Sequence, residues 1–474
     1  MGKKALKPNF GTDGWRAIIG EGFSIENSLI VIKSLLNTFQ NRRKKFAIGY
    51  DTRFLSSDIA YKLSNYLINN GHEVYISESP VPTPTVSFTV KNMRCDFGII
   101  ITASHNSYEW NGIKIKNSEG QSIDDKVVKK ISNEIENIDL DKEDYKKLTH
   151  NSKNNQINYE DFISPYIDSI KKLIDINKIK KAKLKVVVDC MFGTSISILN
   201  RILGGDDCNI IEINNNINPN FPGIKQPEPI SQNLKRLKST VTELNADIGF
   251  GFDADSDRVG VVDNMGLYID APYVFCSISD HILGNREEVK SFCTTVSMTS
   301  MADKIADFYN IDCIRTKIGF KYVAPAMSEN NSILGGEESG GYSYAPHLNE
   351  RDGTISALLL LEQLVHYKFD ANNLYSSQKE KYGKFFFKRT DLTIKEESKE
   401  NLIKYIKDFN SKSLFDKKIK SIDKKDGLKI TLNDDTWVLL RLSGTEPVAR
   451  IYCESLNEKN LNDLITKFKN QIKT

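Results

Sequence analysis

The stretch ADIGFGFDADSDR, residues 246–258, joins an apolar run to a loop that contains three aspartates. The run at 246–252 has the length and composition of a strand buried on both faces, which is typical of parallel sheets covered by helices. In such sheets ligands bind at the carboxyl ends of the strands, and the aspartates follow the run at that end. The stretch therefore predicts an α/β domain with a ligand-binding loop after a central strand.

The same order of short apolar strands, helical segments and a polar loop occurs three times along the chain. The expected strands lie at 46–50, 72–76 and 96–102, at 184–189, 209–213 and 246–252, and at 291–298, 312–316 and 332–336. The third strand of each unit runs into a polar loop: TASHNS at 102–107, DADSDR at 253–258 and GGEESGG at 335–341. We therefore expect three related α/β domains with largely parallel sheets, each presenting one loop at an equivalent place.

The end of the chain follows a different pattern. Strand-like runs lie at 384–394, 427–432 and 436–442, with helical patterns at 397–410 and 457–471. This arrangement predicts a C-terminal α+β domain with an antiparallel sheet. The loop RLSGTEP at 441–447 follows one of its strands.

Length and composition restrict the class of protein. A chain of 474 residues has room for about three or four domains. Its 65 basic and 62 acidic residues leave a net charge of only +3, which argues against a nucleic-acid-binding protein. The seven cysteines form no C-x-x-C pair, the N-terminus lacks a secretory pattern, and no run approaches the ~18 apolar residues of a membrane span. We therefore expect a cytoplasmic protein without nucleic-acid or membrane partners.

Three aspartates of the second loop, Asp253, Asp255 and Asp257, indicate a metal site. Their carboxylates can converge only if the loop curls, and three converging carboxylates are tolerable only around a cation. Oxygen ligands suit Mg²⁺ or Ca²⁺. The EF-hand pattern is excluded, because Arg258 and Asn264 stand where it needs glycine and glutamate. The alternative is a solvated acidic turn.

The C-terminal loop suits a phosphate. Arg441 can bind phosphate through two hydrogen bonds, and Gly444 lets backbone N–H groups approach an anion closely. The hydroxyls of Ser443 and Thr445 add donors. The alternative is a hairpin turn with an incidental arginine.

The first loop offers a nucleophile. Ser104 follows a buried strand, and His105 or Lys114 could assist proton transfer. The G-x-S-x-G pattern of α/β-hydrolases is absent, because Ala103 and His105 flank the serine. The alternative role for the serine is a helix N-cap, which is compatible with a nucleophile.

The third loop places Glu337 and Ser339 between glycine pairs. A carboxylate and a hydroxyl on such a loop suit recognition of vicinal sugar hydroxyls. The alternative is a plain surface loop. A serine, a metal site, a sugar site and a phosphate site together suit the transfer of a phosphoryl group on a phosphosugar.

The chain resembles the α-D-phosphohexomutase superfamily, specifically its bacterial-type phosphoglucomutase/phosphomannomutase branch. Segments with the order and spacing of the family cover nearly the whole chain: FGTDGWR at 10–16, TASHNSYEWNGIKI at 102–115, PEP at 227–229, DADSDR at 253–258, GFKY at 319–322, GGEESGGYSY at 335–344, ERDG at 350–353 and RLSGTEP at 441–447. The loops depart from the family pattern at Ser107, Ala254, Ser256 and Leu442, none of which removes a reacting group.

The resemblance implies four domains around a central cleft, with one loop from each. The expected boundaries are 1–155, 156–264, 265–378 and 379–474. By resemblance, Ser104 carries the phosphate and, with the three aspartates, binds Mg²⁺. The residues expected near the reacting group or the substrate are Arg16, His105, Lys114, Arg258, Lys317, Glu337, Ser339, Arg441, Ser443, Gly444 and Thr445.

The resemblance further implies an enzyme that interconverts hexose 1-phosphates and hexose 6-phosphates, of glucose or mannose, with a hexose 1,6-bisphosphate as intermediate and activator. Lys114 is the first expectation for the proton-handling group and His105 the second. The alternatives are a phosphosugar phosphatase and a phosphosugar-binding protein without turnover. A haloacid-dehalogenase-like phosphatase would usually have threonine four residues after its first aspartate, where this chain has Asp257. The expected partner is a small phosphosugar, and the expected assembly is a monomer or homodimer.

Overall fold

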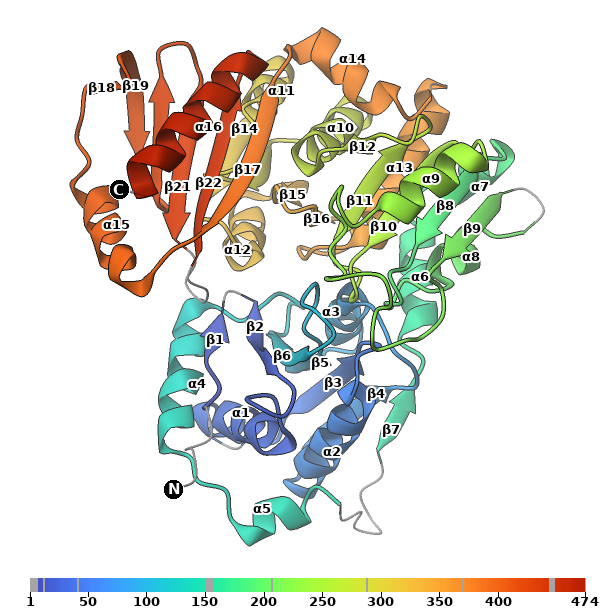
Figure 1. The fold of residues 1–474 in the computed structure, drawn as a ribbon. Coiled ribbons are helices and arrows are strands. Elements are labelled where there is room, and N and C mark those ends of the chain that lie inside the picture. Colours follow the sequence, from blue (N-terminus) through green and yellow to red (C-terminus); the bar gives the residue numbers. More distant parts are fainter. Residues whose placement is uncertain are drawn as a thin grey trace.

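The computed structural model describes residues 7–11, 13–40, 42–149, 157–205, 208–286, 289–368, 370–442 and 448–473. The chain forms four sheets with helices against them, in the order expected from the sequence (Figure 1). Three sheets are mixed with a parallel centre, and the fourth is antiparallel throughout. The predicted fold class is therefore confirmed.

The first domain contains a seven-stranded sheet in the order β1-β2-β6-β5-β3-β4-β7. Its strands are β1 Phe10–Gly11, β2 Gly14–Ile18, β3 Lys45–Tyr50, β4 Glu73–Ser77, β5 Phe97–Ile101, β6 Trp110–Lys116 and β7 Asn158–Glu160. Its helices are α1 Ile25–Thr38, α2 Ser56–Asn69, α3 Thr83–Asn92, α4 Asp125–Asn137 and α5 Lys142–Lys146. The buried strand β5 pairs in parallel with β3 and antiparallel with β6, so the loop after β5 lies beside the residues of β6. Because β7 pairs with β4, this sheet takes a strand from beyond residue 155, where the boundary was expected.

The second domain has a five-stranded sheet in the order β12-β11-β10-β8-β9. Its strands are β8 Lys185–Asp189, β9 Asn209–Ile213, β10 Ile248–Phe252, β11 Val259–Asp263 and β12 Tyr268–Ile269. Its helices are α6 Ile163–Lys171, α7 Ile176–Lys181, α8 Ile198–Leu203 and α9 Lys235–Glu243. Every residue of β10 and β11 is buried, and the aspartate loop connects these two strands. The loop is thus held at both ends by the centre of the sheet.

The third domain has a four-stranded sheet in the order β14-β13-β15-β16. Its strands are β13 Ser291–Thr295, β14 Asp312–Thr316, β15 Leu334–Gly336 and β16 Tyr342–Tyr344. Its helices are α10 Ala271–Asn285, α11 Met301–Tyr309, α12 Phe320–Asn330, α13 Gly353–Tyr367 and α14 Asn373–Tyr382. Helix α13 is apolar on nearly all sides, as a helix buried in a core must be, and Asp352 caps its N-terminus by accepting from the Ile355 N–H.

The fourth domain has a six-stranded antiparallel sheet in the order β17-β22-β21-β20-β19-β18. Its strands are β17 Phe386–Thr393, β18 Ser413–Leu414, β19 Lys417–Asp423, β20 Leu428–Leu432, β21 Trp437–Leu442 and β22 Val448–Ser455. Its helices are α15 Glu396–Asp408 and α16 Glu458–Lys473. Arg441 is the penultimate residue of β21, and residues 443–447 lie outside the described part of the chain.

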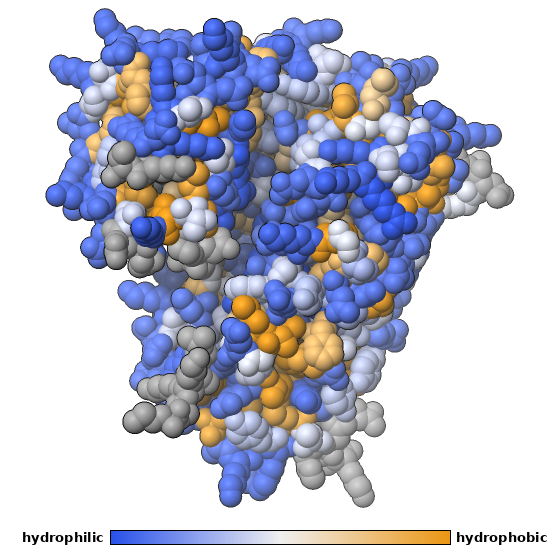
Figure 2. Space-filling model, in the orientation of Figure 1, coloured by the Kyte–Doolittle hydropathy of each residue, from blue (hydrophilic) through white to orange (hydrophobic). Residues whose placement is uncertain are grey.

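Hydrophobic packing joins the domains unequally. One core runs through both the second and the third domain, from Tyr166 to Phe385, whereas the first and fourth domains have cores of their own. A small cluster that includes Ile318 and Trp437 connects the third domain to the fourth. Figure 2 shows a largely hydrophilic face on which hydrophobic residues gather in small patches. Among the helices of the described ranges, none combines the length and the apolar character that a membrane crossing requires.

Candidate active site

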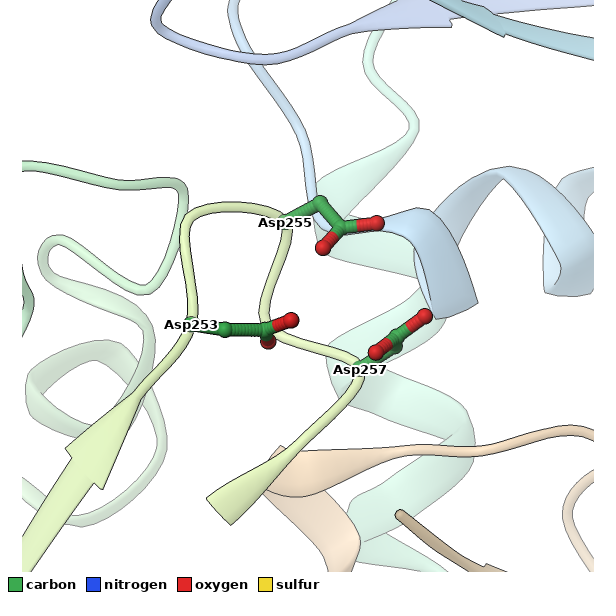
Figure 3. A group of neighbouring side chains, drawn as sticks. All are labelled: Asp253, Asp255 and Asp257. Atoms are coloured by element: carbon green, nitrogen blue, oxygen red, sulfur yellow. The ribbon is translucent and has the colours of Figure 1, made fainter. Parts of the chain in front are cut away.

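The aspartate loop between β10 and β11 curls so that its three carboxylates converge (Figure 3). The side chains of Asp253, Asp255 and Asp257 are almost fully buried, and one oxygen of each lies within 4.8 Å of the others. Gly193 packs against the backbone of Ala254, which holds the loop in place, and the Thr194 N–H donates to Ala254 O at 2.9 Å. This is the convergence that the sequence pattern predicted.

The carboxylate oxygens of this loop are suitable ligands for a hard divalent cation. Within the described part of the chain, Asp255 Oδ1 and Asp257 Oδ1 are buried without a hydrogen-bond donor. A buried carboxylate oxygen without a donor is costly, and a bound cation would satisfy both atoms. Carboxylate oxygens are the ligands that Mg²⁺ and Ca²⁺ prefer.

Ser104 lies beside this cluster, in the loop that follows β5. Its Oγ donates to Asp253 Oδ2 at 3.0 Å, and His105 Nδ1 lies 3.4 Å from the same Oγ. The serine is 1% exposed, and its φ of +51° is unusual for a residue with a side chain. Backbone strain of this kind persists only where the surroundings enforce it, and it concentrates at functional sites.

Arg53 binds the backbone of the serine loop through hydrogen bonds. Its guanidinium donates to the carbonyl oxygens of Ser104, Asn106 and Ser107. Its side chain is fully buried and pairs with Asp51. The loop is therefore clamped by an arginine that the sequence patterns did not single out.

Lys114 projects from β6 into the same cluster. Its Nζ lies 2.7 Å from Asp255 Oδ2, 2.8 Å from Asp257 Oδ2 and 2.9 Å from Asp13 Oδ2. Burial alone would lower the pKa of this ammonium, but the three carboxylates raise it overall. Lys114 therefore stays protonated and compensates the charge of the aspartates.

Asp253 and Asp255 differ in their preference for a proton. Burial and the negative charges of Asp255 and Asp257 raise the pKa of Asp253 well above its usual range. Burial would also raise the pKa of Asp255, but contact with the Lys114 ammonium and a hydrogen bond from the Thr83 hydroxyl lower it overall. A cation near Asp253 would replace the proton that this environment favours.

Two further predicted residues surround the serine loop. Arg16, on β2, donates to Asn106 Oδ1 at 2.9 Å. Burial and the positive charges of neighbouring arginines and Lys114 lower the pKa of His105 well below 6.5. His105 is therefore neutral near pH 7 and able to accept a proton.

Asp13 and Arg351 complete the charge network, although sequence reasoning missed both. Arg351 NH2 lies 2.6 Å from Asp13 Oδ2 and 2.9 Å from Asp257 Oδ2. The first and third domains thus both contact an aspartate of the second. Their segments, FGTDGWR and ERDG, were conspicuous for their resemblance to the family, and that was the signal available. Arg258, the remaining predicted cation of this region, pairs with Glu228 at 3.3 Å.

The predicted sugar-binding residues lie in the third domain. Glu337 is buried, and its Oε1 accepts from the Gly319 N–H at 2.9 Å. Burial raises the pKa of Glu337 to about 7. Ser339 follows in the same loop and is partly exposed, while Lys317 is exposed beside the Tyr322 ring.

The predicted phosphate site is only partly described. Ser443, Gly444 and Thr445 lie outside the described residues. The side chain of Arg441 is mostly buried, and its Nε donates to Asp426 Oδ2 at 3.1 Å. Among the described residues no contact joins Arg441 directly to the aspartate cluster, so the structure brings together the serine, the aspartates and Lys114 but places Arg441 apart from them.

Four domain families match the chain in the order in which the sheets occur. The phosphoglucomutase/phosphomannomutase α/β/α domains I, II and III match residues 7–142, 164–266 and 272–382, and the C-terminal domain matches 394–471. The chain belongs to the phosphoglucomutase/phosphomannomutase family. It is therefore an enzyme, an isomerase of the phosphohexomutase class, and the resemblance noted in the sequence is confirmed.

Relatives of this phosphohexomutase align over nearly its whole length. A phosphoglucosamine/phosphogalactosamine mutase of Sulfurisphaera tokodaii is 32% identical over 467 residues, covering 97% of this chain and 98% of the relative. A phosphoglucomutase/phosphomannomutase of Thermococcus kodakarensis is 32% identical over 463 residues, covering 96% of each. The relatives share the mutase class and differ in the sugar that their names give.

A solved structure has the same fold. The phosphoglucomutase/phosphomannomutase family protein of Burkholderia thailandensis superposes with a TM-score of 0.80 at 22% identity, covering 98% of this phosphohexomutase and 96% of that chain. The four-domain arrangement is thus common to both proteins.

Proposed function

We propose that this phosphohexomutase interconverts hexose 1-phosphates and hexose 6-phosphates, of glucose or mannose, through a phosphoserine at position 104. The observation that carries the proposal is the contact between Ser104 Oγ and Asp253 Oδ2 at 3.0 Å, inside a cluster of three buried aspartates. A nucleophilic oxygen beside a cation site is the arrangement that phosphoryl transfer requires.

The first half-reaction would proceed on phosphorylated Ser104. The free 6-hydroxyl of a hexose 1-phosphate attacks the phosphorus, so that the bond from O6 to phosphorus forms and the bond from Ser104 Oγ to phosphorus breaks. His105 accepts the hydroxyl proton and returns it to Ser104 Oγ, which lies 3.4 Å from its Nδ1. The product is a hexose 1,6-bisphosphate and a free serine.

The second half-reaction is the reverse with the sugar turned over. Ser104 Oγ attacks the phosphorus at position 1, its proton passes to His105, and the leaving O1 takes that proton. The serine regains its phosphate and the hexose 6-phosphate leaves. The bisphosphate is therefore both intermediate and activator, since any unphosphorylated enzyme needs it to recover.

Lys114 has a different part in this proposal from the one that the sequence suggested. An ammonium engaged by three carboxylates within 2.9 Å is a poor base, so we assign it charge compensation and give proton transfer to His105. Arg16 and Arg258 supply further positive charge around the transferred phosphoryl group.

The aspartates and the oxygen of Ser104 would hold Mg²⁺. When bound, the ion supplies positive charge that stabilises the phosphoryl group in the transition state. Two buried oxygens without donors, Asp255 Oδ1 and Asp257 Oδ1, support a cation at this place within the described region.

The substrate is bound by the remaining loops in this proposal. Glu337 and Ser339 contact the sugar hydroxyls, and Lys317 lies at the edge of the same site. Arg441 with the loop residues Ser443, Gly444 and Thr445 binds the phosphate that does not react. Each domain thus contributes one loop, at 102–107, 253–258, 335–341 and 441–447.

A substrate panel tests the function. Glucose, mannose, glucosamine and N-acetylglucosamine 1-phosphates are each incubated with Mg²⁺ and a trace of bisphosphate, and the 6-phosphate is measured. We expect the highest kcat/KM with the glucose or mannose compound. A preference for an amino sugar would overturn the sugar assignment and leave the mutase class intact.

A measurement of free phosphate separates the mutase from a phosphatase. A mutase keeps the phosphoryl group on the sugar or the serine, so phosphate release should be far slower than isomerisation. Stoichiometric release of phosphate without isomerisation would refute the proposal.

A further inference from the structure

One carboxylate oxygen connects the fourth domain to the third. Asp426, in the turn between β19 and β20, accepts through Oδ2 from Arg441 Nε at 3.1 Å and from the Ile318 N–H at 2.8 Å. The aspartate and the arginine both have mostly buried side chains, at 20% and 13% exposed. The contact therefore lies in a sheltered interface, where an ion pair is screened less than at the surface.

The turn is built to bring this carboxylate to the arginine. Gly427, next to Asp426, has a φ of +99°, and a Cβ at that position would lie 2.3 Å from Leu440 O. Only glycine permits so close an approach to β21 in that backbone conformation. The turn is thereby pressed onto the strand at Leu440 and Arg441, which fixes Asp426 beside the guanidinium.

The segment of the third domain that Asp426 contacts, at 317–319, also donates a hydrogen bond to Glu337, the proposed sugar-binding residue. The Ile318 N–H donates to Asp426, and the next N–H, that of Gly319, donates to Glu337 Oε1 at 2.9 Å. The Ile318 side chain packs in the cluster with Trp437 of the fourth domain. Two successive amides thus bind the carboxylate that pairs with Arg441 and the predicted sugar-binding carboxylate of Glu337.

We propose that Asp426 is a positioning residue for phosphate binding: it orients Arg441 and ties it to the segment at 317–319 that positions Glu337. The inference rests on the proposed role of Arg441 as the group that binds the non-reacting phosphate. A carboxylate on Nε holds the guanidinium plane, so that the terminal nitrogens meet a phosphate without first losing conformational freedom. The positions of Arg441 and Glu337 relative to each other are then fixed, and so is the distance between the phosphate and sugar contacts.

A double-mutant cycle tests this role. The variants Asp426→Ala, Arg441→Ala and the double variant are compared for KM and kcat with hexose 1-phosphate at saturating Mg²⁺. We expect Asp426→Ala to raise KM roughly tenfold, by analogy with the loss that follows removal of a partner that orients a metal ligand. Because the aspartate acts through the arginine, its removal from the Arg441→Ala enzyme should change KM by less than about twofold.

The chain offers a matched control in the neighbouring turn. Asp434 pairs with Lys417 at 2.8 Å and accepts from the Thr436 N–H at 3.2 Å. Like Asp426, it therefore binds one side-chain cation and one backbone N–H, but it does not contact Arg441. Asp434→Ala should retain the wild-type KM. Asp426→Asn keeps the shape and an acceptor, so it should fold and raise KM less than alanine does.

The outcomes separate this inference from the proposed function. If Arg441→Ala raises KM and neither Asp426 variant does, the positioning role is wrong and the phosphate site stands. Full additivity in the cycle, or an equal loss in Asp434→Ala, would likewise overturn the role. A wild-type KM for Arg441→Ala would remove the phosphate site itself and with it the inference.

Discussion

Ser104 Oγ lies 3.0 Å from Asp253 Oδ2, although 149 positions of sequence separate the two residues. The serine follows a strand of the first domain and the aspartate follows a strand of the second. The contact therefore depends on how two sheets pack against each other, and it places the proposed nucleophile beside the proposed cation site.

Phosphate on Ser104 is the first testable consequence. Peptide mass spectrometry of the active enzyme should find about 80 Da, one phosphoryl group, on the peptide that contains Ser104. Removal of a nucleophile abolishes the covalent route, so Ser104→Ala should lose activity by on the order of 10³-fold or more. Phosphate on another residue, or full activity of the variant, would contradict the assignment.

The second prediction concerns Asp255. The change Asp255→Asn removes one negative charge from the cation site and keeps the shape of the side chain. The Mg²⁺ concentration that gives half-maximal rate should rise by at least about tenfold, since even outer partners of metal ligands contribute that much. The exposed Asp434→Asn serves as control, and an unchanged midpoint in Asp255→Asn would mean that the loop is only an acidic turn.

Gly193 should control the aspartate loop without binding anything itself. A Cβ on this residue would lie 2.6 Å from Ala254 O, so Gly193→Ala must displace the backbone between Asp253 and Asp255. We expect a higher Mg²⁺ midpoint and a loss of about 1–3 kcal/mol in the free energy of unfolding, as in other overpacked sites.

A second glycine provides the comparison for this variant. At Gly284, on α10, the nearest atom to an added Cβ is the hydroxyl at the end of the Tyr309 side chain, at 3.1 Å, rather than a backbone atom. Gly284→Ala should therefore keep the wild-type midpoint. Equal midpoints for both alanine variants would show that the loop does not depend on Gly193.

The roles of Lys114 and His105 can be separated by substitution. If Lys114 compensates charge, Lys114→Arg should retain much more activity than Lys114→Met. If His105 transfers the proton, His105→Gln should lower kcat by about 10²- to 10⁴-fold. Since its pKa lies below 6.5, the wild-type rate should fall only on the acid side of that value, and His105→Gln should lose this limb. If Lys114→Arg and Lys114→Met are equally inactive, charge compensation is not the role of Lys114, and the proton transfer is assigned to Lys114 instead of His105.

Glu337 should make stability depend on pH. Burial raises its pKa from 4.5 to about 7 in the folded protein, so the folded state binds this proton more tightly than the unfolded state. Stability contributed by the proton is present below pH ~4.5 and is lost as the pH rises toward ~7. Thermal unfolding should therefore show a steeper fall in Tm between pH 5 and pH 8 for the wild type than for Glu337→Gln. Parallel curves would mean that the carboxylate is ionised throughout this range.

Much of the fold was predictable from local sequence. The apolar runs at 96–102 and 246–252 became the buried strands β5 and β10, because an uninterrupted apolar run of this length is stable only inside a covered sheet. The loops that follow these strands carry the residues that meet at the site. The short strand β7 was not predicted, because its pairing with β4 is decided by the neighbouring strand and its own three residues are all exposed.

The sequence by itself determined the kinds of chemistry available: three alternating aspartates, a serine after a buried strand, and an arginine before a glycine-containing loop. Only the tertiary structure decided the partners: the contact of Ser104 with Asp253, the three carboxylates around Lys114, and the link from Arg441 through Asp426 to the third domain. Hydrophobic periodicity and local composition involve only a few neighbouring residues, and so they can be recognised in the sequence. Ion pairs between domains depend on sheet packing and on turns such as the one at Gly427, which no local pattern encodes.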